Sequence, residues 1–353
     1  MTVRLLAAGL LFIATTLIAE PTDIESLTDR AAEGDAEAQF RLGAHYHSGR
    51  DVESDAERAV ALFEAAAGQG HERAKLVLGF IFLDGMGIDP DPEQAVHWLE
   101  RAARAGNAPA QETLGWLYGV GEAVEQDHVA ARHYFSLAAE QGDAAAKAQL
   151  GYLLAYGYGG EPDIEGGLSL FRAAAEQGEP MGLYNLAIAY AEGLNGEADP
   201  GRAHALYHQA AAAGHHEAQY NLAAQYDFGE GVEQDLVEAA RWYRKAAEGG
   251  ILDAMYNLAV LYEEGEGVEQ DFTAAAHWFR QAAEQGDAYA ALDLAKLYAE
   301  GRGVGADPVR AYGWMTRAIA GGASEASAER EALGATLTEA QITEAEAWAE
   351  AGD

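Results

Sequence analysis

The side chains that could bind a metal ion are few in this chain and are poorly spaced for that role. His204 and His208 are four residues apart, a spacing that brings two imidazoles onto one face of a helix. A transition-metal site needs further ligands, and the sequence supplies no certain third one. His45 and His47 are two residues apart and would point to different sides of a helix. We therefore expect no metal site.

The sequence also lacks the patterns that mark common catalytic centres. It contains no S-x-x-K, G-x-S-x-G or H-E-x-x-H motif and no glycine loop of the phosphate-binding type. Cysteine is absent, which excludes disulfides, thiolate metal sites and a cysteine nucleophile. No D-x-D-x-D-G segment supports a calcium site. We predict a protein that has no catalytic residues, is not an enzyme and binds no cofactor.

The charge balance limits the kinds of partner. Lys and Arg number 22 and Asp and Glu number 58, which gives a formal net charge of -36. Such a chain repels phosphate backbones and anionic lipid, so we expect no nucleic-acid partner. Hydrophobic residues make up 49% of the sequence, which is too much for a disordered acidic chain.

The first 19 residues resemble a secretory signal peptide. Arg4 supplies a positive charge, residues 5–18 are uncharged and mostly apolar, and Ala19 is a small residue at the expected cleavage site. The run is shorter than the roughly 20 apolar residues of a membrane-spanning helix, so an uncleaved anchor is the weaker alternative. We predict cleavage after Ala19, no membrane insertion afterwards, and a periplasmic or secreted protein of a Gram-negative bacterium.

Glycines at a fixed spacing show an internal repeat. They are 36 residues apart without an exception and divide residues 35–322 into eight repeats of equal length. The glycines are Gly34, Gly70, Gly106, Gly142, Gly178, Gly214, Gly250, Gly286 and Gly322.

Each repeat has the pattern of two helices. Position 4 is Ala in seven repeats, position 8 is always Leu, position 9 is Gly or Ala, and position 15 is always Gly. This pattern gives a first helix with one apolar face, a close contact at position 9 and a glycine stop. Position 21 is always Asp, which predicts the N-cap of a second helix. That second helix has Ala at position 32 in every repeat and should bury the position-28 aromatics Trp98, Tyr134, Trp242, Trp278 and Trp314.

The segments flanking the repeats are predicted to be helical caps. Residues 20–34 should form one helix before the first repeat. Residues 323–353 should form two more helices after the last repeat, and the second of these begins with the capping-box spacing of Thr338 and Gln341. The terminal helices would cover the ends of the stack with a polar outer face.

Several segments closely resemble the Sel1-like repeat, a relative of the tetratricopeptide repeat with a longer inter-helix loop. They include Ala218-Gln-Tyr-Asn-Leu-Ala, Gly229-Glu-Gly-Val-Glu-Gln-Asp235 and Ala239-Ala-Arg-Trp-Tyr-Arg-Lys-Ala-Ala-Glu-Gly249. The resemblance extends over all eight repeats and implies an all-α, right-handed α-solenoid. Repeats four and five differ from it in the loops at residues 157–163 and 193–199.

By the same resemblance, the first helices line the concave face of the solenoid, and positions 6, 7, 10 and 13 are exposed there. Tyrosines at position 6 and asparagines at position 7 would form ladders suited to an extended peptide. In the alternative, the tyrosines pack between repeats and the asparagines satisfy neighbouring helix ends. The candidate binding residues are Tyr184, Asn185, Tyr220, Asn221, Tyr256 and Asn257, with Phe80, Trp116 and Tyr152 at position 10.

The function predicted from these features is that of an exported, monomeric scaffold that binds another protein or an extended peptide on its concave face. Acidic inter-helix loops would attract a basic partner, or they would serve only to keep the protein soluble. Two alternatives remain open. One is a cell-wall hydrolase of the β-lactamase-like or peptidoglycan-acting kind, and the other is a secreted effector that binds a host protein.

Overall fold

A computed structural model describes residues 23–194 and 196–351. The predicted signal peptide, residues 1–19, lies outside this range. The described residues form nineteen helices, α2 to α20, and no β-strand. They fall into two compact units, one ending at Gln177 and the other beginning at Gly178. We call the described parts of these units the N-terminal half (residues 23–177) and the C-terminal half (residues 178–351).

The helices of the N-terminal half are α2 (Ile24–Ala32), α3 (Ala36–Ser48), α4 (Ala56–Gly68), α5 (Glu72–Asp84), α6 (Pro92–Arg104), α7 (Ala108–Val120), α8 (His128–Glu140), α9 (Ala144–Ala155) and α10 (Ile164–Ala175). The helices of the C-terminal half are α11 (Pro180–Ala191), α12 (Pro200–Ala212), α13 (His216–Phe228), α14 (Leu236–Glu248), α15 (Leu252–Glu264), α16 (Phe272–Glu284), α17 (Ala288–Glu300), α18 (Pro308–Ala320), α19 (Ala326–Gly334) and α20 (Glu339–Ala351).

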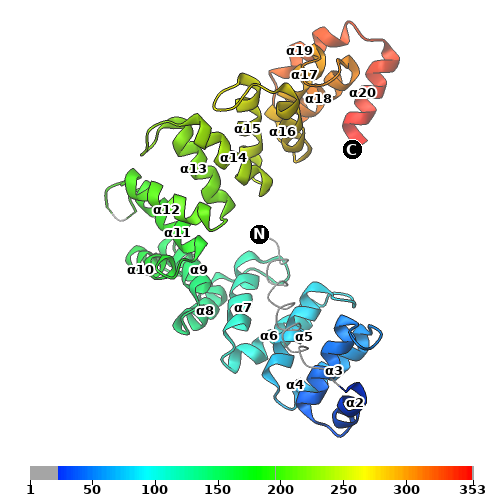
Figure 1. The fold of residues 1–353 in the computed structure, drawn as a ribbon, viewed down its shortest axis with the longest axis vertical. Coiled ribbons are helices and arrows are strands. Elements are labelled where there is room, and N and C mark those ends of the chain that lie inside the picture. Colours follow the sequence, from blue (N-terminus) through cyan, green and yellow to red (C-terminus); the bar gives the residue numbers. More distant parts are fainter. Residues whose placement is uncertain (1–22, 195, 352–353) are drawn as a thin grey trace. The chain divides into compact units, whose positions relative to one another are not determined.

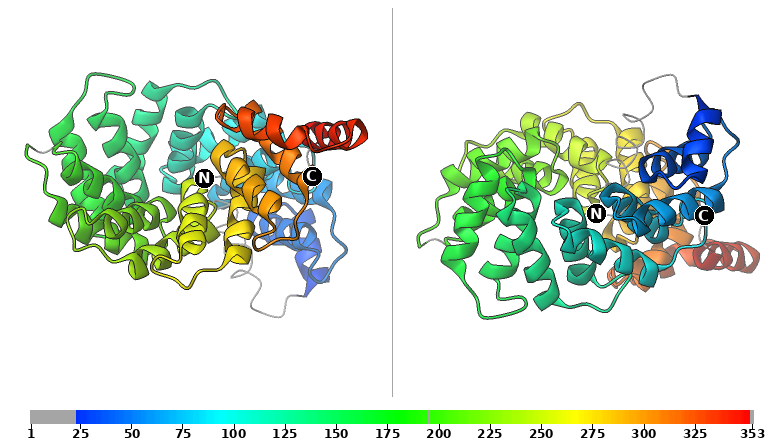
Figure 2. Two further views of the ribbon diagram at one scale, coloured as in Figure 1. Left: turned by 90° about the horizontal axis from the view of Figure 1, so that it is seen from above. Right: turned by 90° about the horizontal axis from the view of Figure 1, so that it is seen from below.

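Within each half, most helices pack against the helix before and the helix after them along the chain (Figures 1 and 2). Each 36-residue repeat supplies one antiparallel pair, such as α3 with α4 or α13 with α14. A single pair cannot bury its apolar faces, and stacking of neighbouring pairs provides the core. The predicted fold class, an all-α solenoid of eight helix pairs, is confirmed.

Aspartates begin the second helix of every repeat, as the sequence predicts. Each position-21 Asp, from Asp55 to Asp307, accepts a hydrogen bond from one or two backbone N–H groups of the first helical turn. In α14, for example, Asp235 Oδ1 accepts from the N–H groups of Val237 and Glu238 at 3.0 and 3.1 Å. These bonds satisfy donors that have no partner inside the helix.

Small residues allow the two helices of a pair to approach closely. The position-4 and position-32 alanines are fully buried wherever they occur, from Ala38 to Ala318. At position 9, a Cβ added to Gly79 would lie 2.6 Å from the Leu99 side chain, and one added to Gly115 would lie 2.7 Å from Phe135. The first and second helices of these repeats therefore touch where the sequence has glycine.

Aromatic residues at position 28 of the second helix differ in burial. Trp98, Trp242 and Trp314 are buried as predicted. Tyr134 and Trp278 are only half-buried, so the prediction of a buried aromatic is wrong for these two. Tyr134 stacks instead on Tyr118, with ring centroids 5.8 Å apart and the rings 5° from parallel.

Helices also occupy both ends of the described chain. α2 lies in the N-terminal segment, and α19 and α20 follow the last repeat. Thr338 and Gln341 form the predicted capping box at the start of α20, because each backbone N–H donates to the side chain of the other residue. α20 packs on α18 through Trp348, which meets Trp314 edge to face with ring centroids 5.0 Å apart. Among the helices described, none is both long enough and apolar enough to cross a membrane.

Candidate functional site

The position-6 tyrosines of the C-terminal half pack against their own and the following repeat. Tyr184 stacks on the His215 ring at a centroid distance of 4.4 Å. The Tyr220 ring lies 5.9 Å from that of Tyr243 on α14. The Tyr256 hydroxyl donates to Asp293 Oδ2 on α17 at 3.2 Å. All three predicted tyrosines are half-buried and take part in contacts between helices.

The position-7 asparagines are largely covered by other residues, whereas a row of side chains that binds a ligand needs to be exposed. Asn185 is buried, and Asn221 and Asn257 are half-buried. Asn257 hydrogen-bonds the hydroxyls of Tyr220 and Tyr243, so the amide of one repeat joins two tyrosines of the repeat before it. Asn257 thus contacts side chains of the preceding repeat, whereas the packing alternative placed the asparagines at neighbouring helix ends, and contact of the asparagines with a ligand stays a prediction.

Charged side chains continue this network on α13, α15, α17 and the turn that follows α17. We call Asp227, Glu263, Asp293, Lys296 and Arg302 the acidic strip. The Tyr243 hydroxyl donates to Asp227 Oδ2 at 3.1 Å, and Lys296 Nζ donates to Asp293 Oδ1 at 2.9 Å. Arg302 lies between Glu263 and a further carboxylate, that of Glu300. Carboxylates therefore outnumber cations along the strip.

Burial and like charge perturb the ionisation of the acidic strip. The pKa of Glu263 is raised above its ordinary value, first because the carboxyl is partly buried and then because Asp293 is nearby. Arg302 and Lys296 oppose this rise without cancelling it. Burial, followed by the negative charge of Asp293, raises the pKa of the Tyr256 hydroxyl as well. Burial is thus the main reason that ionisation of Glu263 and Tyr256 is disfavoured, and the negative charge of Asp293 adds to it.

In the N-terminal half, the position-10 aromatics behave differently from one another. Phe80 is buried in the core, which is the position of a packing residue. Trp116 and Tyr152 instead line one cavity of about 180 Å³ formed by α7, α8, α9 and the loop that follows α9. His128 and Tyr158 line the same cavity. The structure therefore brings together two of the three predicted position-10 residues.

Sequence analysis missed the other aromatic residues of this cavity. Tyr156 lies outside the cavity lining, whereas Tyr158 lines the cavity and belongs to the loop at residues 157–163, where the departure of repeat four from the family pattern was the only available signal. Their rings lie 4.8 and 5.7 Å from the ring of Tyr152. Partial burial, followed by the proximity of Tyr158, raises the pKa of the Tyr152 hydroxyl.

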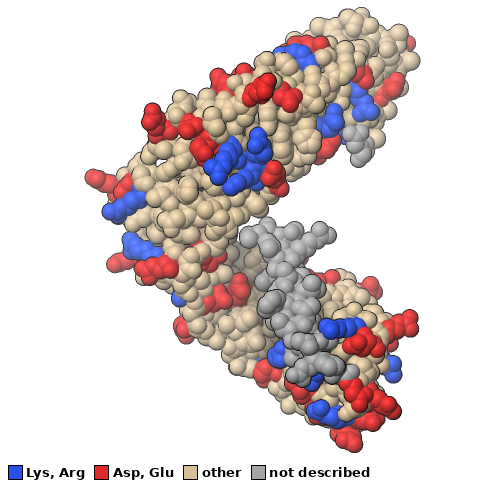
Figure 3. Space-filling model, in the orientation of Figure 1, with Lys and Arg blue, Asp and Glu red and all other residues tan. Residues whose placement is uncertain are grey.

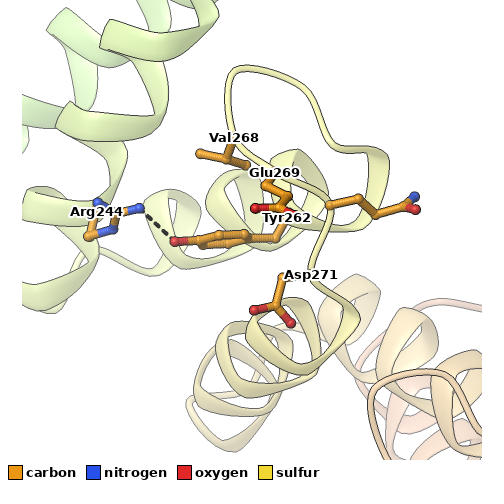
Figure 4. Close-up of a pocket in the computed structure, with 6 residues that line it drawn as sticks. Arg244, Tyr262, Val268, Glu269 and Asp271 are labelled. Carbon is orange, nitrogen blue, oxygen red and sulfur yellow. Dashed lines mark hydrogen bonds between the residues drawn. The ribbon is translucent and has the colours of Figure 1, made fainter.

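A second recess, of about 510 Å³, lies beside the α15–α16 loop, and its polar groups already have structural partners. In Figure 4 the Arg244 guanidinium points to the Tyr262 hydroxyl, to which it donates a hydrogen bond of 2.6 Å. Asp271 caps α16, and Gln270 Nε2 donates to the Glu263 carbonyl at 2.8 Å. Arg280 and Tyr298 repeat the first contact one repeat later. The recess is therefore a feature of the repeat and offers no distinct chemistry.

The histidines considered above as metal ligands have other partners. His204 Nδ1 lies 3.1 Å from Gln225 Oε1, and His208 meets Trp242 edge to face. His45 is buried and its Nδ1 lies 2.9 Å from the Arg50 carbonyl oxygen. Within residues 23–194 and 196–351, no three His, Asp or Glu side chains are grouped as metal ligands.

On the face shown in Figure 3, acidic side chains are scattered among other residues. Figure 3 shows them on both halves, interspersed with fewer lysines and arginines. The inter-helix loops carry exposed acids such as Glu122, Glu125, Glu230 and Glu233. These side chains provide a negative field around more specific contacts.

The chain belongs to the Sel1 repeat family. The family model matches eight segments, residues 36–71, 73–107, 108–143, 144–179, 180–215, 216–251, 252–287 and 288–322. Proteins built from this repeat are generally scaffolds for protein interactions, and the fold is typically not catalytic.

Solved structures include similar chains of the same family. A Sel1 repeat protein from Oxalobacter formigenes is 31% identical, with 91% of this chain and 93% of that chain covered and a TM-score of 0.71. A protective antigen of uropathogenic Escherichia coli with an SLR fold is 27% identical, with 92% and 93% covered and a TM-score of 0.37. No match was found among curated proteins.

Proposed function

We propose that the protein is an exported, non-enzymatic scaffold whose first helices bind an extended, basic segment of another protein. The proposal is supported by membership of a family of protein-interaction scaffolds and by the acidic strip of the C-terminal half. The strip is the observation that carries it, because its charge is unbalanced within the chain. A lysine or arginine from a partner would supply the missing charge.

The exposure of the strip suits a contact with a partner. The side chains of Glu263 and Asp293 are 25% and 21% exposed, so they can be reached from solvent while their charges are only partly screened. Tyr256 and Asn257 lie on the same helix as Glu263 and are held by neighbouring repeats. The partner would therefore meet charged groups on a rigid support, which lowers the entropy lost on binding.

The test removes charge from the strip without changing side-chain shape. Glu263→Gln combined with Asp293→Asn should weaken binding of a lysine-containing peptide and leave a neutral peptide of equal length unaffected. The matched control is Glu230→Gln combined with Glu233→Gln, which removes the same charge from an exposed loop. Affinity would be measured by fluorescence anisotropy at low and high salt, with thermal unfolding of each variant alongside.

The expected result is a loss of roughly tenfold for the strip variant and a smaller loss for the loop variant, since exposed charges are screened more strongly. Equal losses in the two variants would mean that only the overall negative charge attracts the peptide. Equal binding of basic and neutral peptides would contradict a charge-selective strip.

A further inference from the structure

We infer that the cavity between α7, α8 and α9 binds an arginine side chain of the partner. This inference rests on the proposed function, because it assigns one side chain of the basic segment to a specific place. Trp116, Phe135 and Leu153 are among the apolar residues that line the cavity, and Tyr152, Tyr158 and His128 line it as well. We call it the aromatic cavity.

The size of the aromatic cavity fits a single side chain. Its volume of about 180 Å³ is below the roughly 300–1,000 Å³ of typical small-molecule sites. Phe135 and Leu153 are buried beneath it and belong to the core of this region. An apolar side-chain stem can therefore rest on a rigid apolar base.

The aromatic rings around the cavity are unusually exposed. Tyr152 and Tyr158 are 40% and 41% exposed, and their rings stack nearly in parallel, 13° apart. The His128 ring lies 5.1 Å from the Tyr158 ring. An exposed cluster of large aromatic side chains is a common feature of interaction sites, where rigid rings bury much area at little entropic cost.

The exposed rings are also not covered by the cations of this chain. Elsewhere the protein places its own cations on its tryptophans, with Arg101 over Trp98, Lys245 over Trp242 and Arg317 over Trp314. Among the described residues, no arginine or lysine lies over the rings of Trp116, Tyr152 or Tyr158. The aromatic cavity thus presents ring faces that attract a cation from a partner.

Polar atoms at the cavity favour arginine over an apolar side chain. His128 Nδ1 is buried and has no hydrogen-bond partner among the described groups, and it accepts a hydrogen bond in the tautomer that carries its hydrogen on Nε2. The amide of Gln149 and the two tyrosine hydroxyls supply further oxygens. A leucine would fill the space and leave His128 Nδ1 without a donor, whereas a guanidinium carries five N–H donors in one plane.

Charge and geometry favour arginine over lysine. Glu122 and Glu125 are exposed in the loop between Val120 and His128, both of which line the cavity, and these two carboxylates would attract a cation from a partner. A planar guanidinium stacks on aromatic rings and is less strongly hydrated than an ammonium group, which lowers the cost of entering an apolar cavity. The partner segment should therefore contain an arginine that lysine cannot fully replace.

The experiment uses short capped peptides of glycine with one central arginine, lysine, citrulline or norleucine. Saturation-transfer NMR with the full-length protein should show transfer to the arginine side chain, and that side chain should shift upfield because of the aromatic rings. Tyr152→Leu combined with Tyr158→Leu should reduce the transfer at least several-fold. The matched control is Tyr289→Leu, a change of an exposed tyrosine on α17.

The possible results separate this inference from the proposed function. Absence of transfer to arginine, or equal transfer to norleucine, would overturn the inference even if longer basic peptides bind the acidic strip. Transfer to arginine that is lost in the cavity variant and kept in the Tyr289 control would support the inference, even if the strip variant has no effect on longer peptides. Circular dichroism of the cavity variant would show whether its helices remain intact. A His128→Phe variant, which removes the hydrogen-bond acceptor and keeps an aromatic ring, should also weaken binding of the arginine peptide.

Discussion

A histidine, and not a carboxylate, caps α13, and this residue links stability to pH. His215 Nδ1 accepts a hydrogen bond from the Ala218 N–H at 3.3 Å, which requires the imidazole to be neutral at that nitrogen. The same ring stacks on Tyr184. Burial lowers the pKa of His215, and the effect of His216 adds to this, while Glu217 opposes it. The folded protein therefore disfavours a protonated His215.

We expect the protein to lose stability as the pH falls below about 6.5, the ordinary histidine value, towards the lower pKa of folded His215. In that interval the unfolded chain binds more protons than the folded one, so stability rises with pH. His215→Asn keeps an acceptor at the cap and removes the titration, so its thermal midpoint should depend less on pH in this interval. His208→Asn, which changes an exposed histidine, is the control and should behave as the original protein does. Identical pH dependence in all three proteins would show that His215 makes no contribution.

At the scale of helices, the repeat pattern was sufficient to predict the elements but not their side-chain contacts. Caps and stops depend on the local backbone, so Asp at position 21 and Gly at position 15 define helix ends in every repeat. The partner of a tyrosine depends on which side chain the next repeat supplies. Tyr184 meets an imidazole because repeat six begins with His215, whereas Tyr256 meets Asp293 of repeat eight. Aligning the repeats shows which position of the repeat each tyrosine occupies, but it does not show which side chain that tyrosine contacts.

The aromatic cavity shows the same limit for the candidate site. Trp116 and Tyr152 could be selected because they occupy one position of the repeat, and the structure brings them together. Tyr158 could not be selected in this way, because position 16 is a tyrosine in this repeat alone and the loop departs there from the common pattern. Prediction from a repeat is therefore strongest where the chain is most regular, and distinctive surfaces arise where it is not.

The contribution of a helix cap to stability can be tested at Asp235, the N-cap of α14. Asp235→Ala removes the acceptor for two N–H groups of α14 and should lower the free energy of unfolding by about 0.5–2 kcal/mol. Binding of the lysine-containing peptide should remain unchanged, because Asp235 caps a helix and is not part of the acidic strip. Urea unfolding and peptide affinity would both be measured, with the exposed loop residue Asp89, changed to Ala, as the control. Loss of affinity at an unchanged unfolding midpoint would assign Asp235 to binding instead of capping.

At the scale of the whole chain, the repeats and the charge serve different purposes. Stacking of helix pairs buries alanines such as Ala66 and Ala246 and aromatics such as Phe63 and Tyr243, so stability is shared between neighbouring repeats. The surplus of acids over bases contributes nothing specific to this packing, and it favours solubility and attraction of basic partners. The fold could thus be predicted from periodicity, while the partner contacts that we propose depend on particular side chains of the aromatic cavity and the acidic strip.

Export is the prediction that concerns the complete chain. Arg4, the uncharged run of residues 5–18 and Ala19 have the order of charge, apolar core and cleavage site in a signal peptide. Expressed in a Gram-negative host, the protein should be recovered from the periplasm with Glu20 as its first residue, as determined by N-terminal sequencing. Leu11→Arg places a charge in the apolar run and should leave the protein in the cytoplasm with its first residues intact, since an interrupted run no longer engages the export machinery. A protein that keeps Met1 and sediments with membranes would instead be anchored, and one that keeps Met1 in the cytoplasm would not be exported at all.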